Sequence, residues 1–237
     1  MRVVVTGASR GIGLELVRQH ARRGDRVLAT CRRPEAAAAL RALAAAHPGL
    51  VEVARLDVTD PEQISAAARA AEGTLGAVDL LWSNAGVYPG CPGTPVEEGP
   101  LGTLRAGDGL SVLAVNAVGA VLLAQGFLPL LRRGERPRLV ALSSGYASLE
   151  LNQGTPYWYG ASKAALNMLH RSLAADPAAR GVVVLLLSPG WVATDMGGPD
   201  APTPVEESVA GMIRVADAAG PDRSGAFLDW RGHRVPW

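Results

Sequence analysis

The sequence predicts a single α/β domain built on a doubly wound parallel sheet of about seven strands, with helices on both faces. Short runs of β-branched and aliphatic residues alternate with alanine-rich stretches along the whole chain. The runs are continuously apolar, which is typical of strands that are covered on both faces. A length of 237 residues suits one large domain, and no linker or tandem repeat interrupts it.

Each of the first six predicted strands is followed by a predicted helix, which is the order that a doubly wound sheet requires. The strands are predicted at Arg2–Thr6, Arg26–Thr30, Val51–Leu56, Asp79–Ser83, Arg138–Ser143 and Val182–Leu187, with a weaker seventh at Ala226–Asp229. The helices are predicted at Gly11–Arg23, Glu35–Ala46, Pro61–Glu72, Gly109–Arg132, Pro156–Ala175 and Val205–Ala219.

Three segments need a separate interpretation. Residues 87–107 and 197–204 are rich in proline and glycine and follow predicted strand ends, where open α/β sheets bind ligands. We expect loops over a binding site, and plain surface loops are the alternative.

Residues 109–131 are apolar enough to suggest a membrane span, but they include Asn116 and Pro129. We therefore favour a helix buried inside a large domain.

The composition argues against several classes of function. The net charge is +1, from 23 basic and 22 acidic residues, so the basic excess of a nucleic-acid or anionic-membrane binder is missing. Cys31 and Cys91 cannot make a disulfide framework, and no Cys/His cluster has metal-ligand spacing. The first residues run directly into strand-like sequence without a signal-type leader, so we expect a cytoplasmic protein.

The first predicted strand ends in a glycine-rich loop that opens a helix. Residues 6–13 read TGASRGIG, with glycines at positions 7, 11 and 13. Glycines allow a tight turn and let a phosphate approach backbone N–H groups at the start of a helix. The spacing differs from the dinucleotide fingerprint Gly-x-Gly-x-x-Gly, but the position between strand and helix indicates a nucleotide site.

Lys163 is the single lysine of the chain, and the other 22 of the 23 basic residues are arginine. Tyr159 precedes it by four residues on a predicted helix, so the two side chains share one face. A nearby ammonium favours the phenolate and would lower the pKa of the tyrosine. Tyr157 lies six residues before Lys163 and therefore on a different face of the helix.

Taken together, these motifs resemble the short-chain dehydrogenase/reductase family, whose fingerprint Thr-Gly-x-x-x-Gly-x-Gly matches residues 6–13. The further matches, in chain order, are Asp57-Val58, Asn84-Ala85-Gly86, Asn116, Ser144, Tyr159-x-x-x-Lys163 and Pro189-Gly190. The resemblance covers essentially the whole chain and implies a Rossmann-type fold. Residues 189–198 and the terminal Pro236-Trp237 are similar to the C-factor-like carbonyl-reductase branch.

The resemblance also implies roles for individual residues. Tyr159 would be the general acid/base, and Lys163 would tune it and bind the nicotinamide ribose. Ser144 would hold the substrate oxygen, with Ser143 as the competing choice. Asn116 would anchor a water in a proton relay through Lys163, and a purely structural helix kink is the alternative. The implied cofactor-binding residues are Gly7, Ser9, Arg10, Gly11, Ile12, Gly13, Arg32, Arg33, Asp57, Val58, Asn84, Ala85, Gly86, Tyr159, Lys163, Pro189, Gly190, Val192 and Thr194.

The charge after the second strand predicts which cofactor is preferred. In an NAD site a carboxylate at this position binds the ribose hydroxyls, whereas in an NADP site cations bind the 2′-phosphate. Residues 29–33 read ATCRR, and no acid occurs before Glu35. Arginine forks suit a phosphate dianion. We therefore expect NADP(H) rather than NAD(H), and a solvated helix entrance is the alternative for Arg32 and Arg33.

These inferences predict an NADP(H)-dependent oxidoreductase that transfers hydride between the nicotinamide and a carbonyl or secondary alcohol. The substrate would be small and moderately hydrophobic, with a cofactor half at residues 1–110 and a catalytic half at 110–237. A redox-neutral dehydratase or epimerase, or a cofactor-binding regulatory protein, stays open as an alternative. The oligomeric state is also open, and both a homodimer and a homotetramer are compatible with the sequence.

Four aromatic residues would border the substrate or pack in the core: Tyr88, Tyr146, Trp158 and Trp191. The four histidines match no relay or metal pattern and are expected at the surface or partly packed: His20, His47, His170 and His233.

Overall fold

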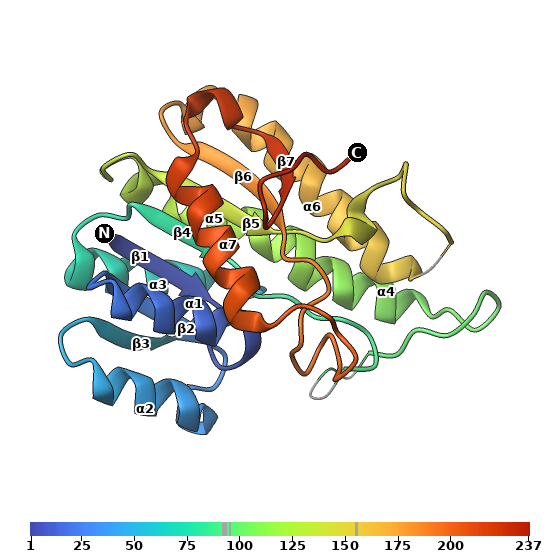
Figure 1. The fold of residues 1–237 in the computed structure, drawn as a ribbon, viewed down its shortest axis with the longest axis horizontal. Helices are drawn as coiled ribbons and strands as arrows, with labels where there is room; N and C mark the ends of the chain where they lie inside the picture. Colours follow the sequence, from blue (N-terminus) through green and yellow to red (C-terminus); the bar gives the residue numbers. More distant parts are fainter. Residues whose placement is uncertain (92–93, 95, 155) are drawn as a thin grey trace.

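The computed structural model describes residues 1–91, 94, 96–154 and 156–237, and within them seven parallel strands form one sheet (Figure 1). The strands are β1 (Arg2–Thr6), β2 (Arg26–Cys31), β3 (Val51–Arg55), β4 (Leu80–Ser83), β5 (Arg138–Leu142), β6 (Val183–Ser188) and β7 (Ala226–Asp229). Their order across the sheet is β3-β2-β1-β4-β5-β6-β7. Because the chain order reverses between β1 and β4, a crevice is expected at the carboxyl ends of these two strands.

Helices cover both faces of the sheet, as the sequence predicted. The α-helices are α1 (Gly11–Arg22), α2 (Ala38–Ala46), α3 (Pro61–Leu75), α4 (Ala106–Leu113), α5 (Ala120–Leu131), α6 (Tyr157–Ala175) and α7 (Val205–Ala218). One face packs against α1, α2 and α7, and the other against α3, α5 and α6 (Figure 1). Every residue of β4, β5 and β6 is buried, which explains why their sequences are continuously apolar.

The apolar stretch predicted as one helix from 109 to 132 begins earlier and is not uniform. It consists of α4, a π-helical segment Ala114–Gly119 and α5. By length and hydropathy, Ala106–Leu131 could cross a membrane, and 44% of its most apolar window is buried inside the fold. The buried part packs on α3, α6 and the sheet. A core helix is apolar on all sides for that reason.

Two histidines correct the sequence-based expectation, because His20 and His170 are fully buried. His20, on α1, contacts Asp25 just before β2 and Trp82 of β4: its Nδ1 is 2.7 Å from Asp25 Oδ2, and its Nε2 accepts a hydrogen bond from Trp82 Nε1 at 3.0 Å. His170 points from α6 into the core, with Nδ1 3.0 Å from the Leu166 carbonyl oxygen. Burial lowers the pKa of both rings, that of His170 to about 4.

Candidate active site

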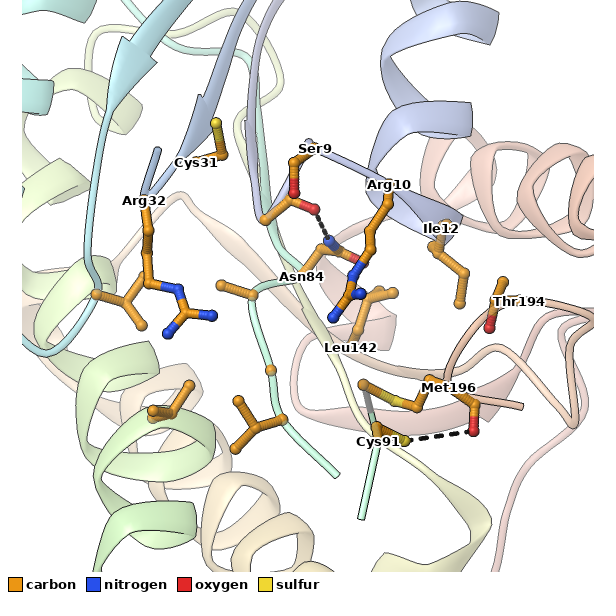
Figure 2. Close-up of a pocket in the computed structure, with 18 of the residues that line it drawn as sticks. Ser9, Arg10, Ile12, Cys31, Arg32, Asn84, Cys91, Leu142, Thr194 and Met196 are labelled. Atoms are coloured by element: carbon orange, nitrogen blue, oxygen red, sulfur yellow. Dashed lines mark hydrogen bonds between the residues drawn. The ribbon is translucent and has the colours of Figure 1, made fainter. Parts of the chain in front are cut away.

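A cavity of about 490 Å³ opens at the carboxyl ends of the strands on both sides of the β1–β4 switch point, and Figure 2 shows part of its wall. Its size is that of a typical small-molecule site. The sequence-predicted residues in its lining are Gly7, Ser9, Arg10, Gly11, Ile12, Gly13, Arg32, Asp57, Val58, Asn84, Ala85, Gly86, Tyr159, Lys163, Pro189 and Thr194. Segments far apart in the sequence are thus brought together at one edge of the sheet.

The glycine loop can follow its path because two of its positions have no room for a side chain. A Cβ at Gly13 would lie 2.3 Å from the Gly7 carbonyl oxygen, and a Cβ at Gly7 would lie 2.9 Å from Ala85 Cα. Gly7 also has φ +66°, which glycine adopts at little cost. The loop therefore leaves backbone N–H groups at the start of α1 open to an anion, which fits a dinucleotide phosphate.

Asn84 joins the ends of β4 and β1 beneath this loop. Its side-chain amide donates to the carbonyl oxygens of Thr6, at 2.7 Å, and Gly7, at 3.2 Å. The Thr6 hydroxyl in turn accepts the backbone N–H groups of Asn84 and Ala85, each at 3.1 Å. These contacts join the ends of β1 and β4 at the floor of the cavity.

One end of the cavity is cationic. Arg32 projects into it beside Cys31 (Figure 2), whereas Arg33 is exposed and is not part of the lining. The Arg10 guanidinium also reaches into the cavity and forms an ion pair with Asp195 at 3.3 Å. Of the two arginines predicted to meet a 2′-phosphate, Arg32 and Arg33, only Arg32 lines the cavity, while Arg10 connects the glycine loop to the segment after β6.

The opposite end holds Tyr159, Lys163 and Ser144. Tyr159 and Lys163 face the cavity from successive turns of α6, with Lys163 Nζ 5.7 Å from the centre of the tyrosine ring. Ser144, two positions after the end of β5, lies close enough to the Tyr159 hydroxyl to lower its pKa. Ser143 points elsewhere, because its hydroxyl is buried and donates to Asn167 Oδ1 at 2.6 Å. This geometry favours Ser144 over Ser143 as the partner of the tyrosine.

The pKa values at this end differ from the sequence-based expectation. Burial raises the pKa of Tyr159 well above its ordinary value, and the hydrogen bond from Ser144 opposes this only in part. Burial also lowers the pKa of Lys163 to about 8. Burial dominates the pKa of Tyr159, and the ammonium of Lys163 is not among the groups that lower it. Lys163 Nζ lies over the Tyr159 ring, 5.7 Å from its centre, and donates to the Leu142 carbonyl oxygen at 2.7 Å.

Asn116 sits in the π-helical segment, and its side chain is fully occupied. It accepts the Val87 N–H at 2.8 Å and donates to the Val87 carbonyl oxygen at 2.9 Å and to Ser162 Oγ at 3.0 Å. The side chain thus joins the start of the segment after β4 to α6. Single-turn π segments are frequent at functional sites, which agrees with a role of Asn116 in the proton relay. That role stays a prediction.

Aromatic rings surround Tyr159. The Tyr88 ring is tilted against it with centroids 4.7 Å apart, and the Tyr146 ring meets it edge-on at 6.2 Å. Tyr146 is 53% exposed, so it can contact a molecule entering the cavity. Trp191 is also largely exposed and donates to the Gly197 carbonyl oxygen, whereas Trp158 packs against α4.

Five of the predicted site residues are not part of the cavity lining: Arg33, Asn116, Ser144, Gly190 and Val192. Ser144 lies close to the Tyr159 hydroxyl, Val192 is buried and bridges to Thr203, and Gly190, with φ +83°, packs against Trp230. The lining residues that sequence reasoning did not select as site residues are Cys31, Leu56, Thr59, Val87, Cys91, Ser111, Ala114, Val115, Leu142, Ser143, Asp195 and Met196. Most follow strand ends, and this position was the available signal.

A Rossmann-type sheet with a glycine-lined cavity at its switch point defines a dinucleotide-binding oxidoreductase. Residues 1–204 match the family described as short chain dehydrogenase. C-signal of Myxococcus xanthus is 43% identical over 164 residues, which cover 68% of this chain and 94% of that protein. The chain belongs to the short-chain dehydrogenase/reductase family, which confirms the predicted family, fold and enzyme class.

Solved structures agree with this assignment. The NADPH-bound carbonyl reductase from chicken fatty liver has a TM-score of 0.89 at 35% identity, covering 99% of this chain and 98% of that one. A carbonyl reductase from Pseudomonas aeruginosa PAO1 in complex with NADP has a TM-score of 0.81, also at 35% identity, with the same coverage of both chains. Similarity to C-signal and to carbonyl reductases agrees with the branch predicted from residues 189–198.

Proposed function

We propose that this enzyme reduces the carbonyl group of a small, moderately hydrophobic substrate with NADPH, or oxidises the corresponding secondary alcohol. The observation that carries the proposal is the presence of Tyr159 and Lys163 together in the wall of the cavity that Arg32 also lines, with Ser144 close to the tyrosine hydroxyl. A bound nicotinamide supplies the hydride. The chain's own residues must then hold the substrate oxygen and deliver a proton to it.

Tyr159 and Ser144 are placed to share this task. Both hydroxyls can donate to a carbonyl oxygen, and such donors stabilise the negative charge that develops there. Tyr159 then gives up its proton as the general acid. Burial disfavours the anionic form of Tyr159, so the phenol is protonated before hydride transfer and can donate its proton to the substrate oxygen. Lys163, on the same face of α6, is placed to bind the nicotinamide ribose.

Arg32 supports NADP(H) as the preferred cofactor. It is a cation in the cavity wall directly after β2, where an NAD-specific site would carry a carboxylate. The NADPH- and NADP-bound carbonyl reductases among the structural relatives are consistent with this choice. Tyr88, Tyr146 and Met196 give the substrate end an apolar character.

The test is NADPH and NADH consumption by the purified protein against a panel of aldehydes, ketones and quinones. Turnover with NADPH, and much weaker turnover with NADH, supports the proposal. A second candidate is a signalling role without turnover, because the Myxococcus xanthus relative carries the name C-signal. Tight NADPH binding without consumption of any carbonyl would favour that role. Product formation without net cofactor change would indicate redox-neutral chemistry.

We also propose self-association through α4 and α6. Leu110, Val118 and Met168 lie on α4, on the π-helical segment and on α6, and at least half of each side chain is exposed. Apolar side chains grouped on two packed helices suit an interface between copies of a chain. Light scattering on the purified protein tests this, and a monomeric mass at micromolar concentration would contradict it.

A further inference from the structure

The N-terminal turn of α6 receives its cap from a distant segment of the chain. The residue before the helix is Pro156, which offers no side-chain cap, so the first N–H groups of α6 need another acceptor. Glu98 supplies it: one carboxylate oxygen accepts the Tyr157 N–H, and the other accepts the Trp158 N–H at 3.0 Å. Glu98 lies 59 and 60 positions away from these residues.

The capped turn is the one that carries the proposed acid. Tyr159 is the third residue of α6, directly after the two residues whose N–H groups Glu98 accepts. Two effects stabilise the Glu98 carboxylate at the N-terminus of α6: its two charge-assisted hydrogen bonds and the positive end of the helix dipole. Its contact therefore fixes the direction in which the first turn of α6 points.

Two other contacts hold the same turn. The Trp158 ring packs where Gly109 of α4 has no side chain, since a Cβ there would lie 2.7 Å from Trp158 Cε3. The Tyr88 ring, from the same segment as Glu98, lies against Tyr159. Glu98 and Tyr88 thus connect the segment after β4 to the start of α6, the first at the helix backbone and the second at the Tyr159 ring.

We propose that Glu98 is a positioning residue, which couples the 87–107 segment to the first turn of α6 and so sets the place of the Tyr159 hydroxyl. This rests on the proposed function. Glu98 touches neither cofactor nor substrate in this scheme and acts through Tyr159 alone. Small displacements of a reacting group cost about 10- to 100-fold in rate, so loss of the cap should be visible in turnover.

The chain offers a matched control, because Glu97 is the adjacent carboxylate and is exposed. We expect Glu98→Ala to lower kcat about tenfold, with the KM for NADPH unchanged. Glu98→Gln keeps one good acceptor and should restore most of kcat. Glu97→Ala should behave like the wild type. A merely structural role would not produce this split between kcat and KM or the rescue by glutamine.

Amide exchange followed by NMR gives a second readout that needs no turnover. Loss of the cap should accelerate exchange at Tyr157 and Trp158 in Glu98→Ala but not in Glu97→Ala. An unchanged kcat, or a raised KM for NADPH at full kcat, would overturn the proposal. If the wild type consumes no carbonyl, the proposed function fails by itself. Amide exchange at Tyr157 and Trp158 then tests whether Glu98 caps α6. Faster exchange in Glu98→Ala supports the contact, and unchanged exchange overturns it.

Discussion

Lys163 Nζ lies 5.7 Å from the centre of the Tyr159 ring and donates a hydrogen bond of 2.7 Å to the Leu142 carbonyl oxygen at the end of β5. The ammonium is thus tied to the sheet and keeps a fixed place relative to the phenol. Ser144, two positions after the last residue of that strand, lies close enough to the phenol to lower its pKa. The strand end therefore positions both partners of Tyr159.

This arrangement makes Tyr159 the first residue to test. Tyr159→Phe removes the proton donor and keeps the ring, so we expect kcat to fall about 10²- to 10⁴-fold. NADPH binding, followed by cofactor fluorescence, should stay near normal. Tyr157→Phe is the control, because that ring lies two positions earlier on α6. Retained turnover in Tyr159→Phe would rule out this residue as the general acid.

Arg32 and Arg33 allow a similar pairwise test of cofactor preference. The guanidinium of Arg32 lines the cavity, whereas that of Arg33 does not. Charge-assisted hydrogen bonds contribute about 1.5–3 kcal/mol, so Arg32→Ala should reduce kcat/KM for NADPH by roughly 10- to 100-fold. The value for NADH should change little, as should both values in Arg33→Ala. Equal losses with the two cofactors would mean that Arg32 does not recognise the 2′-phosphate.

Most of the fold and much of the cavity could be predicted because their signals are local. The continuous apolar runs gave strands within one residue of their observed ends, and the glycine loop needs particular residues at Gly7 and Gly13. Glu98 could not be found in this way. Its partners lie about 60 positions away, and nothing in a proline-rich segment predicts which carboxylate will reach a helix start.

The buried histidines and the π-helical segment were missed for a different physical reason. His170 belongs to a helix whose apolar positions surround it, and a polar residue on a buried face looks the same in sequence as one at the edge of that face. Residues 114–119 are almost wholly apolar, so no periodicity distinguishes a π turn from an α turn there. Tertiary packing decides both features.

The burial of His170 predicts a pH dependence of stability. Its pKa is lowered to about 4 in the folded protein, against about 6.5 in an unfolded chain. The unfolded state therefore binds a proton first as the pH falls, and this disfavours folding. The stabilisation is fully present above pH 6.5, and about 3 kcal/mol of it is lost by pH 4.

Urea unfolding at several pH values measures this effect. His170→Gln has no group that titrates there, so its free energy of unfolding should fall less steeply between pH 6.5 and 4 than that of the wild type. Some pH dependence of the unfolding free energy should remain in His170→Gln, because burial also lowers the pKa of His20. The partly exposed His47 serves as control in His47→Gln. Identical slopes for the wild type and His170→Gln would show that this histidine is not buried in its neutral form.

Two glycines predict opposite effects of the same substitution. In Gly13→Ala the new Cβ would meet the Gly7 carbonyl oxygen at 2.3 Å, so the loop must shift at a cost of about 1–3 kcal/mol. We expect a lower melting temperature and NADPH affinity weakened at least about tenfold. Gly73 lies in α3 with nothing within 4 Å of a Cβ, so Gly73→Ala should stabilise the protein by about 0.5–1 kcal/mol. Thermal melting with and without NADPH separates the two effects, because the Gly73 variant should keep the full shift on cofactor addition. A Gly13 variant that kept this shift as well would contradict the tight packing of the loop.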